Sequence, residues 1–288
     1  ATEGSLTEMM VGKKVELNIE RTQPKDTVKR LSVSNLTVYN REGVKVLDDV
    51  SFDAYGGEIL GIAGISGNGQ KELLESIAGL QVTAEGSSIK FYEKGKEDKP
   101  LQLIGKTPKK IRDAGVHLAF VPEDRLGMGL VGSMGMTGNM LLKTYGAGRS
   151  FLTEMKGPKK MAEKVREELE VVTPSINTPV SRLSGGNVQK VLVGREIAEE
   201  PTVLMTAYAV RGLDINTSYT IYNLLDEEKR HGVAVVYVGE DLDVLIDLCD
   251  RILVLCDGKA NGMVDARTIT KEEVGLLMTN LRKAGAQE

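Results

Sequence analysis

Short hydrophobic runs alternate with amphipathic stretches along most of the chain. Runs of strand length and composition occupy residues 31–39, 45–55, 58–65, 115–125, 201–210, 233–240 and 251–259. Stretches with an apolar stripe at helical spacing occupy residues 70–80, 155–172, 187–200, 216–232 and 241–249. Because strands that alternate with helices favour a parallel sheet, the pattern predicts an α/β core. The first two strands, joined by the turn sequence NREG, predict an antiparallel addition, and the helical middle of the chain predicts a second one.

The first 30 residues differ from the rest of the chain. Residues 12–30 are charged, lack helical periodicity and include Pro24, which is typical of a linker. Before them, residues 2–10 resemble residues 270–278 at an offset of 268 residues, so that Met10 matches Met278. Two unrelated amphipathic helices would give the same spacing. The similarity between the two stretches also fits the tail of a preceding domain of the same kind. We expect residues 1–30 to be such a tail followed by a linker.

A glycine-rich loop, GISGNGQK from Gly64 to Lys71, lies between a predicted strand and a predicted helix. It departs from the phosphate-binding pattern G-x-x-x-x-G-K-[ST] at its last two positions. A strand, a glycine turn and a helix start together aim backbone N–H groups at phosphate. A dinucleotide-binding turn would need a third glycine where Glu72 stands. By itself, the loop fits either a phosphate site or a purely structural turn.

Composition narrows the classes of function. A net charge of −4, a pI of about 5.5 and the absence of basic stretches argue against binding of nucleic acid. The longest apolar run is of strand length, well short of the ~20 residues that a membrane span needs. Cys249 and Cys256 lack the spacing of a metal site, so we expect both to be buried apolar side chains.

Two further motifs decide how the glycine loop is interpreted. LSGGNVQK, which begins at Leu183, puts a serine and two glycines at a helix start about 120 residues beyond the loop. VLMTAYAVRGLD, which ends at Asp214, is a buried strand with a polar turn. In this order and spacing the motifs resemble the nucleotide-binding domain of ABC transporters, where LSGGN is the signature and the strand before RGLD is the Walker B strand. FVPEDR, GNGQ and GEDLDV narrow the resemblance to the second half of tandem import ATPases of the simple-sugar group, in the branch that serves nucleoside importers with basic-membrane-type lipoproteins.

This resemblance implies an α/β fold of the ABC type, with a RecA-like core, an antiparallel β subdomain and an α-helical subdomain. We expect the nucleotide-binding domain at residues 31–288 and its helical subdomain at about 125–194. The implied nucleotide-binding residues are Tyr39, Gly64, Ile65, Ser66, Gly67, Asn68, Gly69, Gln70, Lys71 and Glu123. The signature residues, which would act on a partner domain's nucleotide, are Leu183, Ser184, Gly185, Gly186 and Asn187. Tyr39 would stack on adenine, although a half-buried strand tyrosine fits as well, and Asp214 would lie at the contact between domains.

Several positions that carry the family's chemistry hold other residues here. Gln70 replaces the P-loop lysine, and Lys71 replaces the Mg²⁺-binding hydroxyl. Ala207 replaces the Walker B aspartate, Tyr208 the glutamate that polarises water, Glu123 the Q-loop glutamine, and Glu240 the switch histidine. Losing a single electrostatic donor typically costs about 10²–10³ in rate. We therefore expect no catalytic residue and no metal site in this half.

The signature, in contrast, is complete. Because ABC domains pair head to tail, it would cap an ATP bound with Mg²⁺ on the P-loop of a preceding homologous domain in the same polypeptide. At this half's own site, ATP binding would be weak or independent of Mg²⁺, with the Lys71 ammonium partly replacing the metal. A solvated Lys71 beside an empty site is the alternative.

The resemblance also implies partners and a location. They are two membrane permease subunits and an extracytoplasmic substrate-binding lipoprotein, with this subunit peripheral at the cytoplasmic face of the membrane. Residues 125–182 would contact the permeases, and the methionine-rich stretch 125–140 would be either a mobile apolar contact or a surface loop. The expected function is uptake of simple sugars or nucleosides. The alternative is a nucleotide-sensing regulatory module, while the acidic charge disfavours an ABC ATPase of DNA repair or translation.

Overall fold

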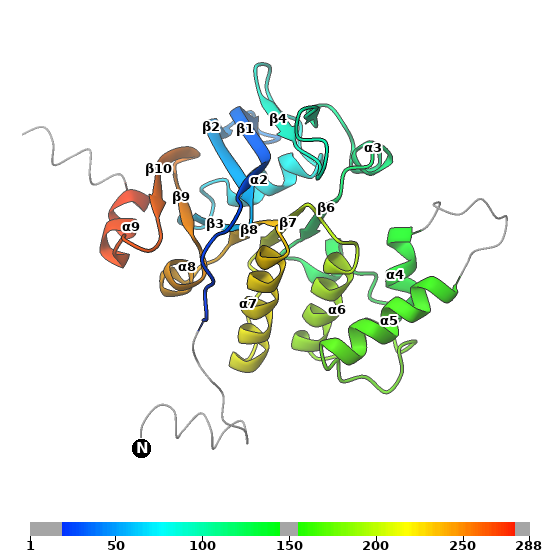
Figure 1. Ribbon diagram of the computed structural model, residues 1–288. Helices are drawn as coiled ribbons and strands as arrows, with labels where there is room; N and C mark the ends of the chain where they lie inside the picture. Colours follow the sequence, from blue (N-terminus) through cyan, green and yellow to red (C-terminus); the bar gives the residue numbers. More distant parts are fainter. Residues whose placement is uncertain (1–18, 145–154, 280–288) are drawn as a thin grey trace, which may run out of the picture.

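The computed structural model describes residues 19–144 and 155–279, which form two sheets surrounded by helices (Figure 1). The antiparallel sheet has the order β2–β1–β4–β5 and consists of β1 (Val28–Tyr39), β2 (Lys45–Gly56), β4 (Ser88–Phe91) and β5 (Leu101–Gln102). The other sheet has the order β10–β9–β3–β8–β7–β6 and consists of β3 (Glu58–Ala63), β6 (Leu118–Val121), β7 (Val203–Ala207), β8 (Ala234–Val238), β9 (Arg251–Cys256) and β10 (Lys259–Asp265). Its strands are parallel except for the edge strand β10. The predicted parallel core and antiparallel addition are confirmed, while β4, β5 and β10 lie outside the predicted strands.

Helices lie on both faces of the parallel sheet, and some extend beyond it (Figure 1). They are α2 (Gln70–Ile77), α3 (Pro108–Asp113), α4 (Met136–Thr144), α5 (Lys156–Glu168), α6 (Gly185–Ile197), α7 (Ile215–Arg230), α8 (Leu242–Leu248) and α9 (Lys271–Met278), with a π-helical turn η1 (Arg125–Gly129) and a 3₁₀ turn η2 (Val180–Arg182). No helix in the described parts of the chain is long and apolar enough to cross a membrane.

Both faces of the parallel sheet are buried because alternate residues of each strand enter different cores. Ile59 of β3 and Val235 of β8 pack on the face covered by α6, α7 and α8. Their neighbours Leu60 and Val236 pack on the opposite face, against α2 and the antiparallel sheet. A strand buried on both faces has a nearly continuous apolar sequence, and this is why these strands could be predicted.

The helices α4 and α5 lie beside α6, on the side of the molecule away from β10 and α9 (Figure 1). Gly194 of α6 allows close packing there, since a Cβ atom at Gly194 would lie 2.5 Å from Cγ1 of Val165 on α5. The bundle also corrects the prediction for the methionine-rich stretch, which forms η1 and the start of α4. Met136 and Met140 are fully buried in the core, so of these methionines only Met128 and Met134 are exposed enough to contact a partner.

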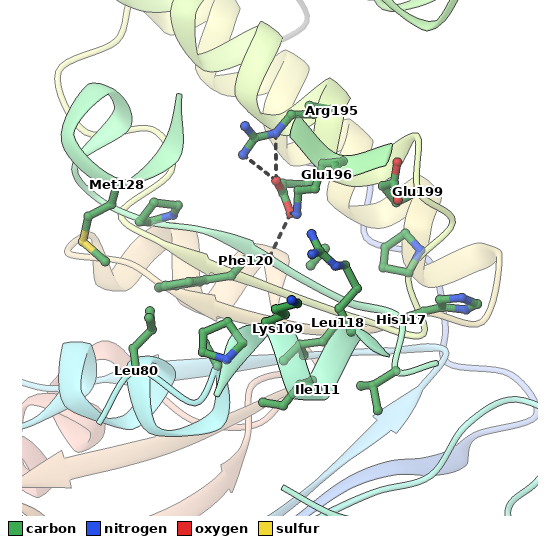
Figure 2. Close-up of a pocket in the computed structure, with 18 residues that line it drawn as sticks. Leu80, Lys109, Ile111, His117, Leu118, Phe120, Met128, Arg195, Glu196 and Glu199 are labelled. Atoms are coloured by element: carbon green, nitrogen blue, oxygen red, sulfur yellow. Dashed lines mark hydrogen bonds and ion pairs between the residues drawn. The ribbon is translucent and has the colours of Figure 1, made fainter. Parts of the chain in front are cut away.

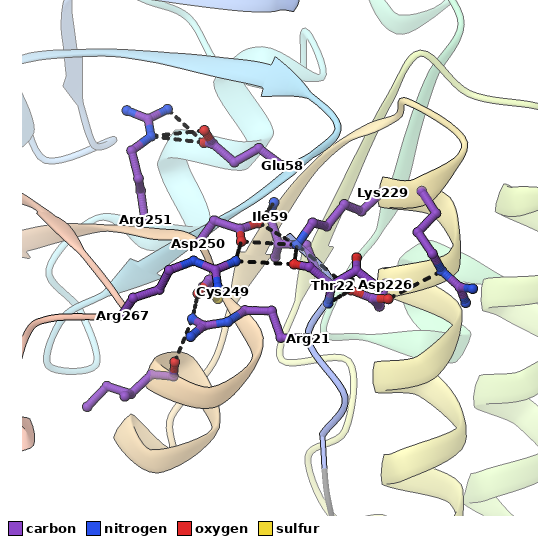
Figure 3. Close-up of polar contacts among 12 residues, drawn as sticks. Arg21, Thr22, Glu58, Ile59, Asp226, Lys229, Cys249, Asp250, Arg251 and Arg267 are labelled. Carbon is purple, nitrogen blue, oxygen red and sulfur yellow. Dashed lines mark hydrogen bonds and ion pairs between the residues drawn. The ribbon is translucent and has the colours of Figure 1, made fainter. Parts of the chain in front are cut away.

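The segment that precedes β1 lies along the core rather than apart from it (Figure 3). Asp226 of α7 accepts hydrogen bonds from the backbone N–H and the hydroxyl of Thr22, at 3.0 and 2.9 Å. The carbonyl of Thr22 accepts from Lys229, at 2.6 Å, and from Arg267, at 3.2 Å. Because β1 begins at Val28, the last residues of the predicted linker belong to a strand. The predicted domain tail at residues 1–18 lies outside the described residues, whereas its matching stretch near the other end is α9.

Candidate functional site

The glycine loop connects β3 to α2 and is anchored on both sheets. Gly67 and Gly69 have φ angles of 91° and 97°, in the left-handed region that favours glycine. A Cβ atom at Gly69 would lie 2.7 Å from the carbonyl oxygen of Val46 on β2. The Asn68 carboxamide donates to the carbonyl of Leu255 on β9, at 3.3 Å. The turn therefore needs glycine, and strands distant in sequence support it.

The Gln70 side chain folds back into the loop. It is only 2% exposed, and its Nε2 donates to the carbonyl of Ile65 at 3.1 Å. Nε2 also lies 2.5 Å from where a Cβ atom of Gly64 would be. A neutral carboxamide at this position supplies no positive charge to a phosphate. The loop residues Ser66 and Gly67 are exposed, so their backbone stays accessible to an anion.

A cavity of about 300 Å³ lies beside the loop, and it brings together several of the predicted site residues. Lys71, Glu123, Ala207 and Tyr208 all line it. The Lys71 ammonium lies 3.9 Å from the Glu75 carboxylate, and the Lys71 side chain is 62% exposed. The two groups are too far apart for a hydrogen bond, and water reaches the ammonium although the Glu75 carboxylate is buried. Lys71 can therefore turn toward the cavity.

The residues around the glycine loop do not fit Mg²⁺. The two positions expected to face the metal present an ammonium, Lys71, and a methyl group, Ala207, and neither can donate an oxygen ligand. Within residues 19–144 and 155–279, no group of three or more His, Cys, Asp or Glu side chains is placed to hold a metal ion.

Arg211 joins three of the replaced positions. Its Nη1 donates to Glu123, its Nε lies 3.2 Å from the Glu240 carboxylate, and its guanidinium carbon lies 5.8 Å from the centre of the Tyr208 ring. The residues come from separate segments, after β6, β7 and β8, whose carboxyl ends meet at one edge of the parallel sheet. The two carboxylates thus share one cation supplied from within the domain.

Tyr208 cannot take the part of the water-polarising glutamate. Burial, and then the nearby charges of Glu123 and Glu240, raise the pKa of its phenol above the usual value. The ring is therefore protonated and neutral at physiological pH. Its backbone has a φ of 51° and donates to the carbonyl of Val238, at 2.9 Å, which fixes the turn that carries Arg211.

The signature begins α6 and is open to solvent. Ser184 is the N-cap of the helix, and its exposed hydroxyl accepts from the backbone N–H of Asn187 at 3.4 Å and from its Nδ2 at 2.9 Å. Asn187 Oδ1 in turn accepts from the backbone of Val172, at 2.8 Å, which ties the helix start to the loop after α5. Gly185 is exposed and Leu183 is partly buried. The start of α6 is thus held rigidly while its first turn faces outward.

Asp214, which is predicted to lie at the contact between domains, lies against the signature. It caps α7 by accepting from the backbone N–H and the hydroxyl of Thr217, at 2.9 and 2.8 Å. A Cβ atom at Gly186 would lie 3.0 Å from the Thr217 hydroxyl and 3.4 Å from the Asp214 carboxylate. These contacts lie apart from the cavity beside the glycine loop, whose lining includes no signature residue among the described ones. The signature and the glycine-loop cavity therefore occupy different surfaces of one domain.

Tyr39 ends β1 and is 49% exposed. It pairs with Lys45, which precedes the Val46 carbonyl that lies against Gly69. The hairpin therefore places Tyr39 near the helix end of the glycine loop, with an exposed ring. Both the adenine-stacking role and the strand role stay predictions.

Two arginines were not among the predicted site residues. Arg211 occupies the turn RGLD, and a cation there was foreseeable because Glu123 and Glu240 put two carboxylates at positions that are neutral in the family pattern. Arg125 follows β6, and its Nη2 donates to the carbonyl of Arg211. No local pattern indicates that contact, since the two residues are 86 positions apart.

Comparison with known proteins places these features in a family. The family model described as ABC transporter matches residues 47–206. The guanosine import ATP-binding protein NupO of Bacillus subtilis (strain 168) is 34% identical over 276 residues, which cover 95% of this chain and 52% of the relative. The nucleoside import ATP-binding protein NupA of Lactococcus lactis is 35% identical, over 96% and 53% of the two chains, and the xylose import ATP-binding protein XylG of Thermoanaerobacter pseudethanolicus is 35% identical, over 95% and 53%. The chain thus spans about half the length of the curated relatives it matches.

Solved structures share the fold. MJ1267, an ATP-binding cassette of an ABC transporter in its ADP conformation, superposes with a TM-score of 0.67 at 21% identity, over 91% of this chain and all of the other. The dimeric post-hydrolysis state of the cassette MJ0796, bound to ADP and phosphate, gives 0.68 at 22% identity, over 83% and 100%. The predicted ABC-type α/β fold is confirmed. The family model also matches more than half of the residues of this chain. The chain therefore belongs to the ABC transporter family.

Proposed function

We propose that the chain is the C-terminal, catalytically degenerate half of the ATP-binding subunit of an ABC importer. One observation carries the proposal: a complete signature, with Ser184 and Gly185 exposed, stands on a domain whose own nucleotide loop lacks the lysine and the hydroxyl of the family pattern. The Gln70 side chain folds into the glycine loop, and Arg211 pairs with both Glu123 and Glu240. Such a domain has little means of hydrolysing ATP alone, but it can complete a site on a partner.

The tandem arrangement accounts for the length of the relatives. A chain that covers about half of each relative fits one of two similar domains in a longer polypeptide. Residues 1–30 would then be the tail of the first domain and a linker, and residues 31–288 the second domain, with its helical subdomain at about 125–194. The signature Leu183–Asn187 would cap the first domain's ATP and Mg²⁺, with Asp214 at the contact between the domains.

At this half's own site, ATP would bind weakly or without Mg²⁺. Lys71 lines the cavity beside the loop and would stand near the phosphates in place of the metal, while Tyr39 would stack on adenine. Titration of a first-domain P-loop variant with ATP, in Mg²⁺ and then in EDTA, tests this role. Equal affinity in the two buffers is expected. A large requirement for Mg²⁺ would rule out the substitution by Lys71.

The permeases would contact the helical region of residues 125–182, and a cavity of about 650 Å³ between α3, β6 and α6, which Met128 and Lys143 of that region help to line, would extend this surface (Figure 2). Its wall includes the apolar side chains Leu80, Phe120 and Met128, and Leu80 and Met128 are more than 40% exposed. Lys109 adds a charge at the same cavity, so it suits a helix or loop with an apolar face and a polar edge. A permease segment of that kind would place the subunit at the cytoplasmic face of the membrane.

The solute would be a simple sugar or a nucleoside, delivered by an extracytoplasmic lipoprotein. This expectation follows the relatives, whose names specify import of guanosine, nucleosides and xylose. The two cavities described above are assigned to the nucleotide and to the permeases, so the proposal leaves solute recognition to the lipoprotein and the permeases.

The variant Ser184→Arg in the full-length protein tests the shared site. It places a long cation where the signature would meet the partner's nucleotide, and ATPase activity should be abolished although the change lies outside the hydrolysing half. Val82→Arg is the matched control, since Val82 is 88% exposed on the antiparallel side and adds the same charge. Unchanged turnover in Ser184→Arg would refute the proposal and favour a nucleotide-sensing regulatory module.

A further inference from the structure

Arg125 is held beside the signature by an unusual turn. It begins the π-helical turn η1, which Asp124 caps by accepting from the backbone N–H of Gly127 at 2.7 Å. From there its Nη2 donates to the carbonyl of Arg211. Its Nη1 lies 3.5 Å from where a Cβ atom of Gly185 would be. The guanidinium therefore reaches the first residue of α6.

The charge of Arg125 is not offset by the domain. Among residues 19–144 and 155–279, no carboxylate forms an ion pair with it. Partial burial alone lowers its pKa, and an arginine stays charged under such a shift. Arg211, in contrast, holds two carboxylates at the domain's own site. Arg211 is thus paired with carboxylates and faces the degenerate site. Arg125 has no carboxylate partner among the described residues and faces the signature.

We propose that Arg125 is a phosphate-binding residue of the ATP site that the signature completes on a partner domain. This inference rests on the proposed function, because the anion is the partner's nucleotide. An exposed first helical turn with a serine and two glycines already presents backbone N–H groups to an anion. A guanidinium beside it adds the full positive charge that Ser184 and Gly185 lack, in a planar fork suited to phosphate oxygens. The carbonyl of Arg211 positions that fork.

The last three residues of the sequence FVPEDR make three different contacts. Glu123 turns to the degenerate site and pairs with Arg211, Asp124 caps the turn, and Arg125 points to the signature. Arg211 links the two surfaces, through its side chain on one side and its carbonyl on the other. The turn that carries Arg211 thus holds a positively charged group at the signature and also pairs with the carboxylates of the domain's own site.

The test compares Arg125→Ala, Arg125→Lys and Ser184→Arg in the full-length protein, with Lys99→Ala as the control. Lys99 is a solvent-exposed cation between β4 and β5, outside the surfaces assigned to the nucleotides and the permeases. The measurements are kcat and KM for ATP and the midpoint of thermal unfolding. We expect Arg125→Ala to lower kcat about 100- to 1,000-fold, the loss typical of one electrostatic donor. We expect Arg125→Lys to recover a large part of the loss, because charge is retained, and the unfolding midpoint to stay within about 2 °C throughout.

The possible results distinguish the role of Arg125 from the proposed function on which it rests. If Ser184→Arg abolishes turnover while Arg125→Ala stays within twofold of wild type, Arg125 does not bind phosphate and the shared site stands. Equal loss in Arg125→Ala and Arg125→Lys, together with a lower unfolding midpoint, would assign Arg125 a purely structural role and overturn the inference. If Ser184→Arg leaves turnover unchanged, the proposed function fails and the inference fails with it.

Discussion

Lys229 is the buried cation that fastens the segment before β1 to the core, and Lys229→Met should destabilise the domain markedly. Its side chain is 1% exposed. Nζ lies 3.0 and 2.9 Å from the two oxygens of Asp250 and donates to the carbonyl of Thr22 at 2.6 Å (Figure 3). Methionine fills a similar volume but removes all of these contacts. Asp250 then stays buried with one cation fewer.

The size of the effect follows from the partners that Asp250 keeps. Removing one partner of a buried pair costs about 3–5 kcal/mol. Asp250 would still accept from Arg267, at 2.8 Å, and from the backbone of Ile59, at 2.9 Å. The loss should therefore lie at the lower end, about 3 kcal/mol in the free energy of unfolding. At roughly 2–4 °C per kcal/mol, the thermal midpoint should fall by about 6–12 °C.

Denaturant unfolding and hydrogen exchange measure the two consequences. Exchange of the backbone at residues 19–27 should rise, because Thr22 loses its closest cation. Lys159→Met is the control, since Lys159 is 62% exposed and lies 3.9 Å from Glu163, so its loss should change stability by less than about 1 kcal/mol. A destabilisation of Lys229→Met below about 1 kcal/mol, with unchanged exchange at residues 19–27, would refute the anchoring role.

Three further changes test the fold and the electrostatics. Asp214→Ala removes the N-cap of α7 and should cost about 0.5–2 kcal/mol in denaturant unfolding, and the difference from wild type should shrink below the usual carboxyl pKa of 3.8, because hydrogen bonding lowers the native pKa of Asp214 and its stabilisation is lost as pH falls. Gly194→Val should lower the unfolding midpoint, since its Cβ would lie 2.5 Å from Val165, whereas an unchanged midpoint would mean that α5 moves freely. The bond from Arg30, at 2.7 Å, lowers the pKa of Glu97 to about 2, so this pair stabilises the fold above pH 4.5 and the contribution fades as pH falls toward 2. Glu97→Gln should therefore differ from wild type in unfolding at pH 6 but not near pH 2.

Some features of the glycine loop follow from the local sequence, whereas others depend on the tertiary structure. The strand, the glycines and the helix start are encoded within about 20 consecutive residues, so their arrangement could be predicted. The sequence also indicated that Gln70, Ala207, Tyr208 and Glu240 depart from the family's chemistry. It did not indicate that Gln70 would bond to Ile65, because a side-chain rotamer depends on the space that surrounding strands leave.

Helices in the middle of the chain were harder to predict. Residues 125–140 have many glycines and no clear period, so the pattern favoured a loop. The structure buries Met136 and Met140 there because α5 and α6 cover them. A weak local preference was overridden by packing against helices distant in sequence.

The class of fold and the departures from the family's usual residues are visible in the amino-acid sequence alone. Both depend on short-range patterns: the period of apolar residues, and the identity of residues inside motifs. Which charges are paired depends instead on the folded structure. Arg211 pairs with Glu123 and Glu240, and Arg125 is left to face the signature, because separate loops converge at the end of one parallel sheet. Charge pairing depends on distances across that edge, and no spacing along the chain specifies them.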